Sequence, residues 1–183
     1  NISFLKDNFK NEKFLIFLNE DEIISNIKLA DISHMIAKFG GKAEMAGWYY
    51  QQFLKMNISR YPLISEYYLI WDSDSIMLRK MNFFDKSNRS IIHTSNEYHQ
   101  TYFQTIRNFG LEKENNFSFI SEHMIINSEI MSELISLIEK TNPKSLSWVN
   151  TIISCINFDN LNKLNANGFS AVSYTHLTLQ TNA

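Results

Sequence analysis

The chain has 183 residues, of which 44% are hydrophobic and 20% charged, and these values are typical of one folded domain. Its formal net charge of −2 argues against the strong positive field of a nucleic-acid-binding protein, so we expect no nucleic-acid partner. The single cysteine, Cys155, excludes an internal disulfide and a cysteine-based zinc site. No run approaches the roughly 20 apolar residues needed to cross a bilayer, and we expect a cytoplasmic protein.

The first half of the chain alternates strand-like and helical segments. Residues 13–18, KFLIFL, are apolar on both faces, which predicts a parallel strand covered on both sides. A helix is expected over 31–39, where a pair of glycines stops it. Over 42–56 the apolar residues recur every three or four positions, which predicts a second helix. The apolar run YYLIW at 67–71 predicts the next strand.

The second half continues this alternation. The sequence SIIH predicts a further strand at 90–93, and short extended pieces are expected at 117–120 and 123–126. Apolar periodicity predicts three helices, over 98–109, 128–140 and 147–156. The first of these helices is expected to end at Gly110, and the second to begin at a Ser128 cap.

Strands that alternate with helices predict a layered α/β fold. Residues 13–18, 67–71 and 90–93 are expected to be neighbouring central strands. Helices 42–56 and 128–140 are expected to pack on that sheet.

Both ends of the chain are unlike those of a complete protein. The chain begins with Asn1 rather than Met, which predicts truncation there. From residue 172 the sequence VSYTHLTLQTNA contains no charged residue and resembles the translated read-through of a sequencing-library adapter. We therefore expect one partial domain over 1–171 and a non-native tail over 172–183 that does not pack on it. A genuine polar C-terminal tail is the alternative.

Two aspartates, Asp72 and Asp74, directly follow the predicted strand 67–71. In an open parallel sheet, ligands gather outside the carboxyl ends of the strands. In an extended chain, residues two apart point to the same side, so both carboxylates could reach one cation. Hard oxygen ligands suit Mg²⁺ or Mn²⁺. The D-x-D spacing also arises often by chance, so an ordinary solvated strand end is the alternative.

Four ordered segments resemble a bacterial glycosyltransferase-like family that was long carried as a domain of unknown function and is associated with surface-polysaccharide synthesis. They are AGWYYQQFLKM (46–56), YYLIWDSDSIMLR (67–79), NEYHQTYF (96–103) and SFISEHMIINS (118–128). The layout also looks like the broader GT-A class, in which a helix leads into a strand that ends in D-x-D. The resemblance covers roughly 13–170. It implies an α/β, GT-A-like open mixed sheet, mostly parallel, flanked by helices and truncated at both ends.

The resemblance also implies a chemistry. A sugar would move from a nucleotide-sugar donor to a saccharide or lipid-linked acceptor, with peripheral association at the inner face of the membrane. Mn²⁺ or Mg²⁺ held by Asp72 and Asp74 would neutralise the charge that builds on the leaving diphosphate. Donor binding would use Asp72, Gln51, Gln52 and Lys55, with the amides on the base or ribose and Lys55 on a phosphate. The alternative is that the two glutamines and the lysine are solvated polar residues.

Three further residues are candidates for catalysis at the acceptor. Glu97, His99 and His123 could bind acceptor hydroxyls or take the acceptor proton, because Glu and His can be tuned towards neutral pH. A hydrogen-bonded structural role is the alternative for each histidine. Two other classes of function compete with the glycosyltransferase. One is a nucleotidyltransferase, and the other is a non-catalytic carbohydrate-binding protein of the same fold.

Overall fold

The computed structural model describes residues 9, 14–96, 99–112, 118, 119, 121–145, 147–164 and 166–171. Its helices are α2 (Glu20–Ile23), α3 (Leu29–Lys38), α4 (Ala46–Asn57), α5 (Gln100–Arg107), α6 (Ser128–Thr141), α7 (Trp148–Cys155) and α8 (Phe158–Leu164). Two 3₁₀ turns flank α4, namely η1 (Ala43–Met45) and η2 (Ile58–Arg60). The strands are β1 (Tyr67–Trp71) and β2 (His123–Asn127). None of these described helices is long and apolar enough to cross a membrane.

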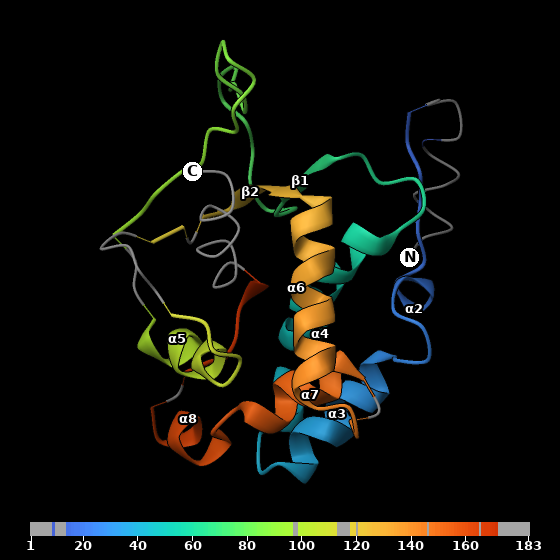
Figure 1. The fold of residues 1–183 in the computed structure, drawn as a ribbon, viewed down its shortest axis with the longest axis vertical. Helices are drawn as coiled ribbons and strands as arrows, with labels where there is room; N and C mark the ends of the chain where they lie inside the picture. The colour runs from blue at the N-terminus through green and yellow to red at the C-terminus, as the bar shows by residue number, and fades with distance from the viewer. Residues whose placement is uncertain are drawn as a thin grey trace.

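The molecule is a mixed α/β structure in which a small sheet lies at one end of a group of helices (Figure 1). Strands β1 and β2 pair antiparallel, with Tyr67 opposite Asn127 and Trp71 opposite His123. They form a two-stranded sheet, the only one within the described residues. The coarse α/β prediction is confirmed, and β1 matches the predicted strand 67–71. The mostly parallel open sheet is absent from the described part of the chain.

Two of the three expected central strands do not form. Residues 14–18, the described part of the expected strand 13–18, form no ladder with any described residue, and the Phe14 side chain is 96% exposed. In the expected strand 90–93, Ser90 alone forms an isolated bridge, to Phe84. Here the backbone bonds locally, because Asp85 accepts from the Arg89 amide in a tight turn. Apolar composition favoured an extended chain at both places but did not specify a partner.

The predicted helices are confirmed, with small differences at their ends. The expected helices 31–39, 42–56, 98–109, 128–140 and 147–156 correspond to α3, η1 with α4, α5, α6 and α7. Gly110 follows α5 with a positive φ of 72°, as expected of a residue just past a helix end. The cap of α6 is Asn127 rather than Ser128, because the Asn127 side chain accepts from the Ile130 amide at 3.1 Å. Ser128 instead donates to the Glu66 carbonyl.

The hydrophobic core is built around α4. Its Phe53 ring is fully buried and lies edge-on to Trp148, with ring centroids 5.5 Å apart, and 5.3 Å from the Phe169 ring. The Tyr49 hydroxyl accepts from the Gly168 amide at 3.0 Å, and burial raises the pKa of Tyr49 to about 12. These contacts hold the segment 166–171 against α4. The same contacts hold α4, the helix that precedes β1, in position.

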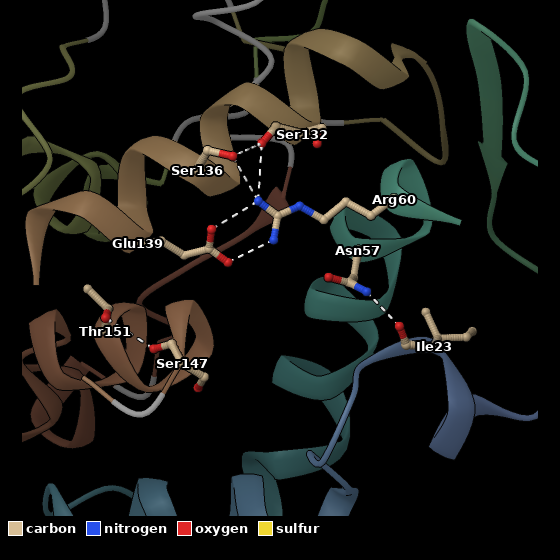
Figure 2. A network of polar contacts seen from close by, with 8 residues as sticks. All are labelled: Ile23, Asn57, Arg60, Ser132, Ser136, Glu139, Ser147 and Thr151. Atoms are coloured by element: carbon tan, nitrogen blue, oxygen red, sulfur yellow. Dashed lines mark hydrogen bonds and ion pairs between the residues drawn. The ribbon is translucent and has the colours of Figure 1, made fainter. Parts of the chain in front are cut away.

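An arginine joins the end of α4 to α6. Figure 2 shows the Arg60 guanidinium directed at α6, where it contacts both carboxylate oxygens of Glu139, at 2.7 and 3.0 Å. The same guanidinium donates to the Ser136 hydroxyl at 2.9 Å and the Ser132 carbonyl at 3.4 Å. Two parallel bonds fix the orientation of a guanidinium, which a single ammonium contact would not. This network sets the course of the chain that leads into β1.

We expect Gly41→Ala to lower the free energy of unfolding by about 1–3 kcal/mol, as overpacking typically does. A Cβ at Gly41 would lie 2.5 Å from Phe158 Cδ1 and 2.6 Å from Ile36 Cγ2. The matched control is Gly47→Ala, in the exposed first turn of α4, where an added Cβ meets no atom within 4 Å. The control should raise stability by about 0.5–1 kcal/mol, because alanine favours helix. Urea unfolding of both variants checks this. Equal losses in both would contradict the packing at Gly41.

Candidate binding site at the end of β1

The paired aspartates lie in a tight turn and not in the strand itself. Strand β1 ends at Trp71, and the Ser75 amide then donates to the Asp72 carbonyl at 3.0 Å. The Trp71 indole N–H donates to the Ser75 carbonyl at 2.9 Å and closes the turn. The same-side argument requires an extended chain, so it does not apply to Asp72 and Asp74. Asp72 is half-buried, whereas Asp74 is exposed.

Lys55 and Asp72 form an ion pair. The Lys55 Nζ lies 2.6 Å from Asp72 Oδ1, and the two side chains are only 18% and 29% exposed. Two hydrogen bonds hold this pair in place. The Tyr68 hydroxyl of β1 donates to the Lys55 carbonyl in the last turn of α4 at 3.1 Å. The Asp72 amide donates to the Glu122 carbonyl, directly before β2, at 3.0 Å.

A cavity of about 410 Å³ lies between α4 and β1. Its polar lining includes Gln51, Lys55 and Asp72, and apolar side chains such as Leu54 and Ile58 line the rest. Small-molecule sites typically combine an apolar wall with a few placed polar groups in this size range. The structure therefore brings three of the predicted donor-binding residues to one cavity.

The α4 lining residues form one stripe of the helix that the sequence analysis missed. Gln51, Leu54 and Lys55 of α4, with Ile58 at the start of η2, have the spacing i, i+3, i+4 and i+7, which is that of one helix face. The stripe mixes polar and apolar residues, so a search for apolar periodicity alone passes over it. A search for any stripe that ends beside a strand carrying acidic residues would have found it.

Gln52 lies away from this cavity. It is buried, and its Oε1 accepts from the Ala171 amide at 3.2 Å and from the Ser170 hydroxyl at 3.3 Å. Adjacent residues of a helix point about 100° apart, so Gln51 and Gln52 face different surroundings. The expectation that Gln52 binds the donor is not supported by its position. Gln52 instead holds the segment 168–171 on α4.

His123 lies in an aromatic cluster on the face of the sheet opposite the helical core. Its ring stacks on Trp71 with centroids 5.1 Å apart, and the His93 ring lies 4.5 Å away. Phe83 meets it edge-on at 6.0 Å. The His123 Nε2 atom is buried and has no hydrogen-bond partner among the described residues. Burial, and then the neighbouring His93, lower the pKa of His123 below its ordinary value, against the opposing effect of Glu122.

We expect His123 to titrate below 6.5, its ordinary pKa, and to be neutral at pH 7. The pKa of His123 is lower in the folded protein than in the unfolded chain, so keeping the imidazole neutral contributes to the free energy of unfolding. This contribution is complete above the unfolded pKa and is lost as the pH falls through the folded pKa. An NMR titration of the imidazole signals checks this, with His123→Gln used to assign the resonance. A His123 titration midpoint at or above that measured in the urea-unfolded chain would contradict the burial of its ring in the aromatic cluster.

Neither His123 nor His99 lines the cavity. Glu97 lies outside the described residues. His99 occupies the position before α5, where its ring tilts against Tyr102 with centroids 4.9 Å apart. It is not among the residues that line the cavity beside Asp72. The structure therefore does not bring His99 to the predicted donor site.

The acidic turn offers two carboxylates, Asp72 and Asp74, as possible cation ligands. Within the described residues, no three His, Cys, Asp or Glu side chains are grouped to hold a metal ion. Asp74 forms no ion pair with the described residues, whereas the Asp72 charge is matched by Lys55. Mg²⁺ is typically bound through one or two carboxylates, with water and substrate phosphate as its other ligands. The residues present fit a cation that arrives with a phosphate ligand.

The described residues form a mixed α/β protein with a cavity beside an acidic turn. The chain belongs to the DUF6492 family, described as a family of unknown function, whose profile matches residues 8–180. Neither the curated proteins nor the solved structures contain a significant match. The family match includes part of the expected tail 172–183. That tail lies outside the described residues, and its non-native origin stays a prediction.

Proposed function

We propose that the protein is a glycosyltransferase that binds a nucleotide-sugar donor in the cavity between α4 and β1. The observation that carries the proposal is the convergence of Gln51, Lys55 and Asp72 on that cavity, with Asp74 two residues further along. A nucleotide sugar presents a flat base, ribose hydroxyls and a diphosphate. An apolar wall, an amide, a carboxylate and an ammonium are the matching groups.

Lys55 would supply the positive charge that the protein's own side chains offer to the diphosphate. The Lys55 ammonium already lies in a half-buried position, where a charge interaction is screened less than at the surface. A diphosphate oxygen would share this ammonium with Asp72. The Asp72 carboxylate would then accept from ribose hydroxyls, and Gln51 would bond the base or ribose. Leu54 and Ile58 would flank the base on the α4 side of the cavity.

The acidic turn would hold the metal ion of the reaction. Asp74, with Asp72 directly or through water, would bind Mn²⁺ or Mg²⁺. Such an ion supplies positive charge beside a leaving diphosphate. The Trp71 indole bond to Ser75 closes the turn, in which Asp72 lines the cavity and Asp74 follows two residues later. Pre-arranged ligands lose less freedom when the ion and phosphate arrive.

In such a transfer, an acceptor hydroxyl attacks the anomeric carbon, the bond to the diphosphate oxygen breaks, and a base takes the acceptor proton. His123 is held neutral, but it lies on the opposite face of the sheet and does not line the cavity, so the proposal assigns no residue to this proton. The acceptor would be a saccharide or a lipid-linked saccharide, used in the cytoplasm at the inner face of the membrane. A GT-A-like relationship belongs to the same proposal and rests on the four ordered sequence segments.

Binding of a nucleoside diphosphate tests the proposal. Calorimetric titration with UDP, GDP and ADP should show binding of at least one in Mn²⁺ that is weakened by chelator. Lys55→Met should weaken it about tenfold or more, as expected for a lost hydrogen bond to a charged group. The matched control is Lys163→Met on α8, whose side chain is exposed at the far end of the molecule from β1 (Figure 1). Absence of binding to all three nucleotides would reject the proposal.

A further inference from the structure

The chain between β1 and α5 extends away from the helices (Figure 1) and exposes a run of apolar side chains. Ile76 is 82% exposed and Leu78 is 92% exposed, and Met77 between them is also exposed. Single exposed apolar residues are common on protein surfaces, but contiguous apolar patches mark interaction sites. Three such residues in succession are therefore a candidate contact surface.

The chain between β1 and α5 carries four cations and four acids, with Asp72, Asp74 and Glu97 at its two ends, and the part between these ends is basic. Between residues 75 and 96 it contains four cations, Arg79, Lys80, Lys86 and Arg89, and one acid, Asp85. This gives a net charge of +3 in a chain whose total is −2. Asp85 is matched by Arg89 at 2.8 Å, so its charge does not oppose the other three cations. All four cationic side chains are exposed.

Contacts with the sheet hold this segment in place, and they leave the apolar residues 76–78 exposed to solvent. Asp85 accepts from the Ser87 and Arg89 amides at 2.8 and 2.9 Å, and the Arg89 carbonyl accepts from the Asp85 amide. The Phe84 ring then packs edge-on against Tyr67 of β1, with centroids 5.2 Å apart. These contacts fix the tight turn without covering Ile76 or Leu78.

We propose that residues 76–89 dock on an anionic lipid surface. Ile76 and Leu78 enter the boundary between headgroups and acyl chains, and Arg79, Lys80 and Lys86 contact the lipid phosphates. Apolar side chains beside exposed cations are the combination that peripheral membrane binding uses. A nucleic acid would match the cations but would offer no apolar surface to Ile76 and Leu78.

Docking in this way would place the acidic turn at the membrane surface, because Asp74 lies two residues before Ile76. A lipid-linked acceptor would then meet the candidate site without leaving the bilayer. The inference itself does not rest on the proposed function, since it requires neither a nucleotide nor a metal ion. Failure of one proposal is therefore distinguishable from failure of the other.

Co-sedimentation with vesicles tests the inference. The protein should bind vesicles of phosphatidylcholine and phosphatidylglycerol, should bind pure phosphatidylcholine poorly, and should be released by salt. The double variant Arg79→Gln/Lys80→Gln should weaken binding about 25-fold, at about fivefold for each cation. Ile76→Ser/Leu78→Ser should weaken it about tenfold or more through the lost apolar burial.

The matched control is Leu63→Ser, because Leu63 is 71% exposed in a segment without this charge pattern. It should bind anionic vesicles as the unmodified protein does. All the substituted side chains are exposed, and circular dichroism of each variant should match that of the unmodified protein. No binding to anionic vesicles would overturn the inference. Loss in the charge variant with full binding by Ile76→Ser/Leu78→Ser would also overturn it, since the apolar run would then have no role.

Discussion

Phe53→Ala is expected to lower the free energy of unfolding by about 3–5 kcal/mol, as for other buried phenylalanines. The Phe53 ring is fully buried and touches Tyr49, Trp148 and Phe169, which come from three separate parts of the chain. Its removal leaves a cavity at the point where α4, α7 and the segment 166–171 meet. Since domains are stable by only about 5–15 kcal/mol, the loss is a large fraction of the total.

Equilibrium unfolding in urea measures this effect. Phe14→Ala is the matched control, because it removes the same atoms from a side chain that is 96% exposed. Its effect should stay within about 0.5 kcal/mol. Similar losses in the two variants would mean that Phe53 is not at the centre of the core.

Asp74→Asn is expected to abolish the metal-dependent part of nucleoside diphosphate binding. Mutation of groups that only orient metal ligands costs about 10–100-fold in affinity, so loss of a ligand should cost about 100-fold or more. Asp74 is exposed and forms no ion pair with the described residues, so its full charge is open to a cation. Asp72 is already matched by Lys55 at 2.6 Å. Asp72→Asn should therefore weaken the metal dependence less, although it also releases Lys55.

The control for both variants is Asp159→Asn on α8, at the opposite end of the molecule from β1 (Figure 1). It makes the same change of carboxylate to amide and should leave calorimetric titrations unchanged. Thermal unfolding should show that all three variants keep the fold. If Asp74→Asn kept full, metal-independent binding, the turn would lose its catalytic role, and a carbohydrate-binding function would be favoured.

The helices could be predicted from the sequence because their signal is local. In α4, the periodic residues Tyr49, Phe53 and Met56 form the buried face as expected. Helices α2 and α8, of four and seven residues, were missed because they are too short to show a period. The cap of α6 was placed one residue late, since Asn127 and Ser128 are both good capping residues and sequence alone does not give their backbone angles.

The sheet could not be predicted because strand pairing is a long-range property. Strand β1 was recognised at its exact bounds, 67–71, but its partner is β2, more than 50 residues further along. The stronger apolar run at 14–18 pairs with no strand in the described part of the chain. Alternation in β2 puts Met124 and Ile126 on the face of the sheet that packs on the core. Pairing with β2 therefore buries apolar side chains on that face of the sheet. Composition gives the tendency to extend, and only burial selects the partner.

The site was partly predictable for a related reason. Lys55 and Asp72 were expected at one donor site because the four ordered segments resemble the glycosyltransferase-like family. The sequence alone could not assign different roles to Gln51 and Gln52, because it does not give the orientation of α4 about its axis. In the structure, Gln51 lines the cavity and Gln52 bonds to Ser170. The tight turn that displaces Asp74 from the strand depends on the Trp71 indole bond, for which the sequence carries no local signal.

Crystals grown with Mn²⁺ and the nucleoside diphosphate that binds best would test the central claim most directly, through anomalous diffraction at the manganese edge. We predict one anomalous peak about 2.1 Å from the Asp74 carboxylate, a typical distance for a small divalent cation. The diphosphate should lie between that peak and Lys55, with the nucleoside in the 410 Å³ cavity. A diphosphate bound instead in the 490 Å³ cavity beside Arg60, or a peak away from Asp74, would contradict the assignment.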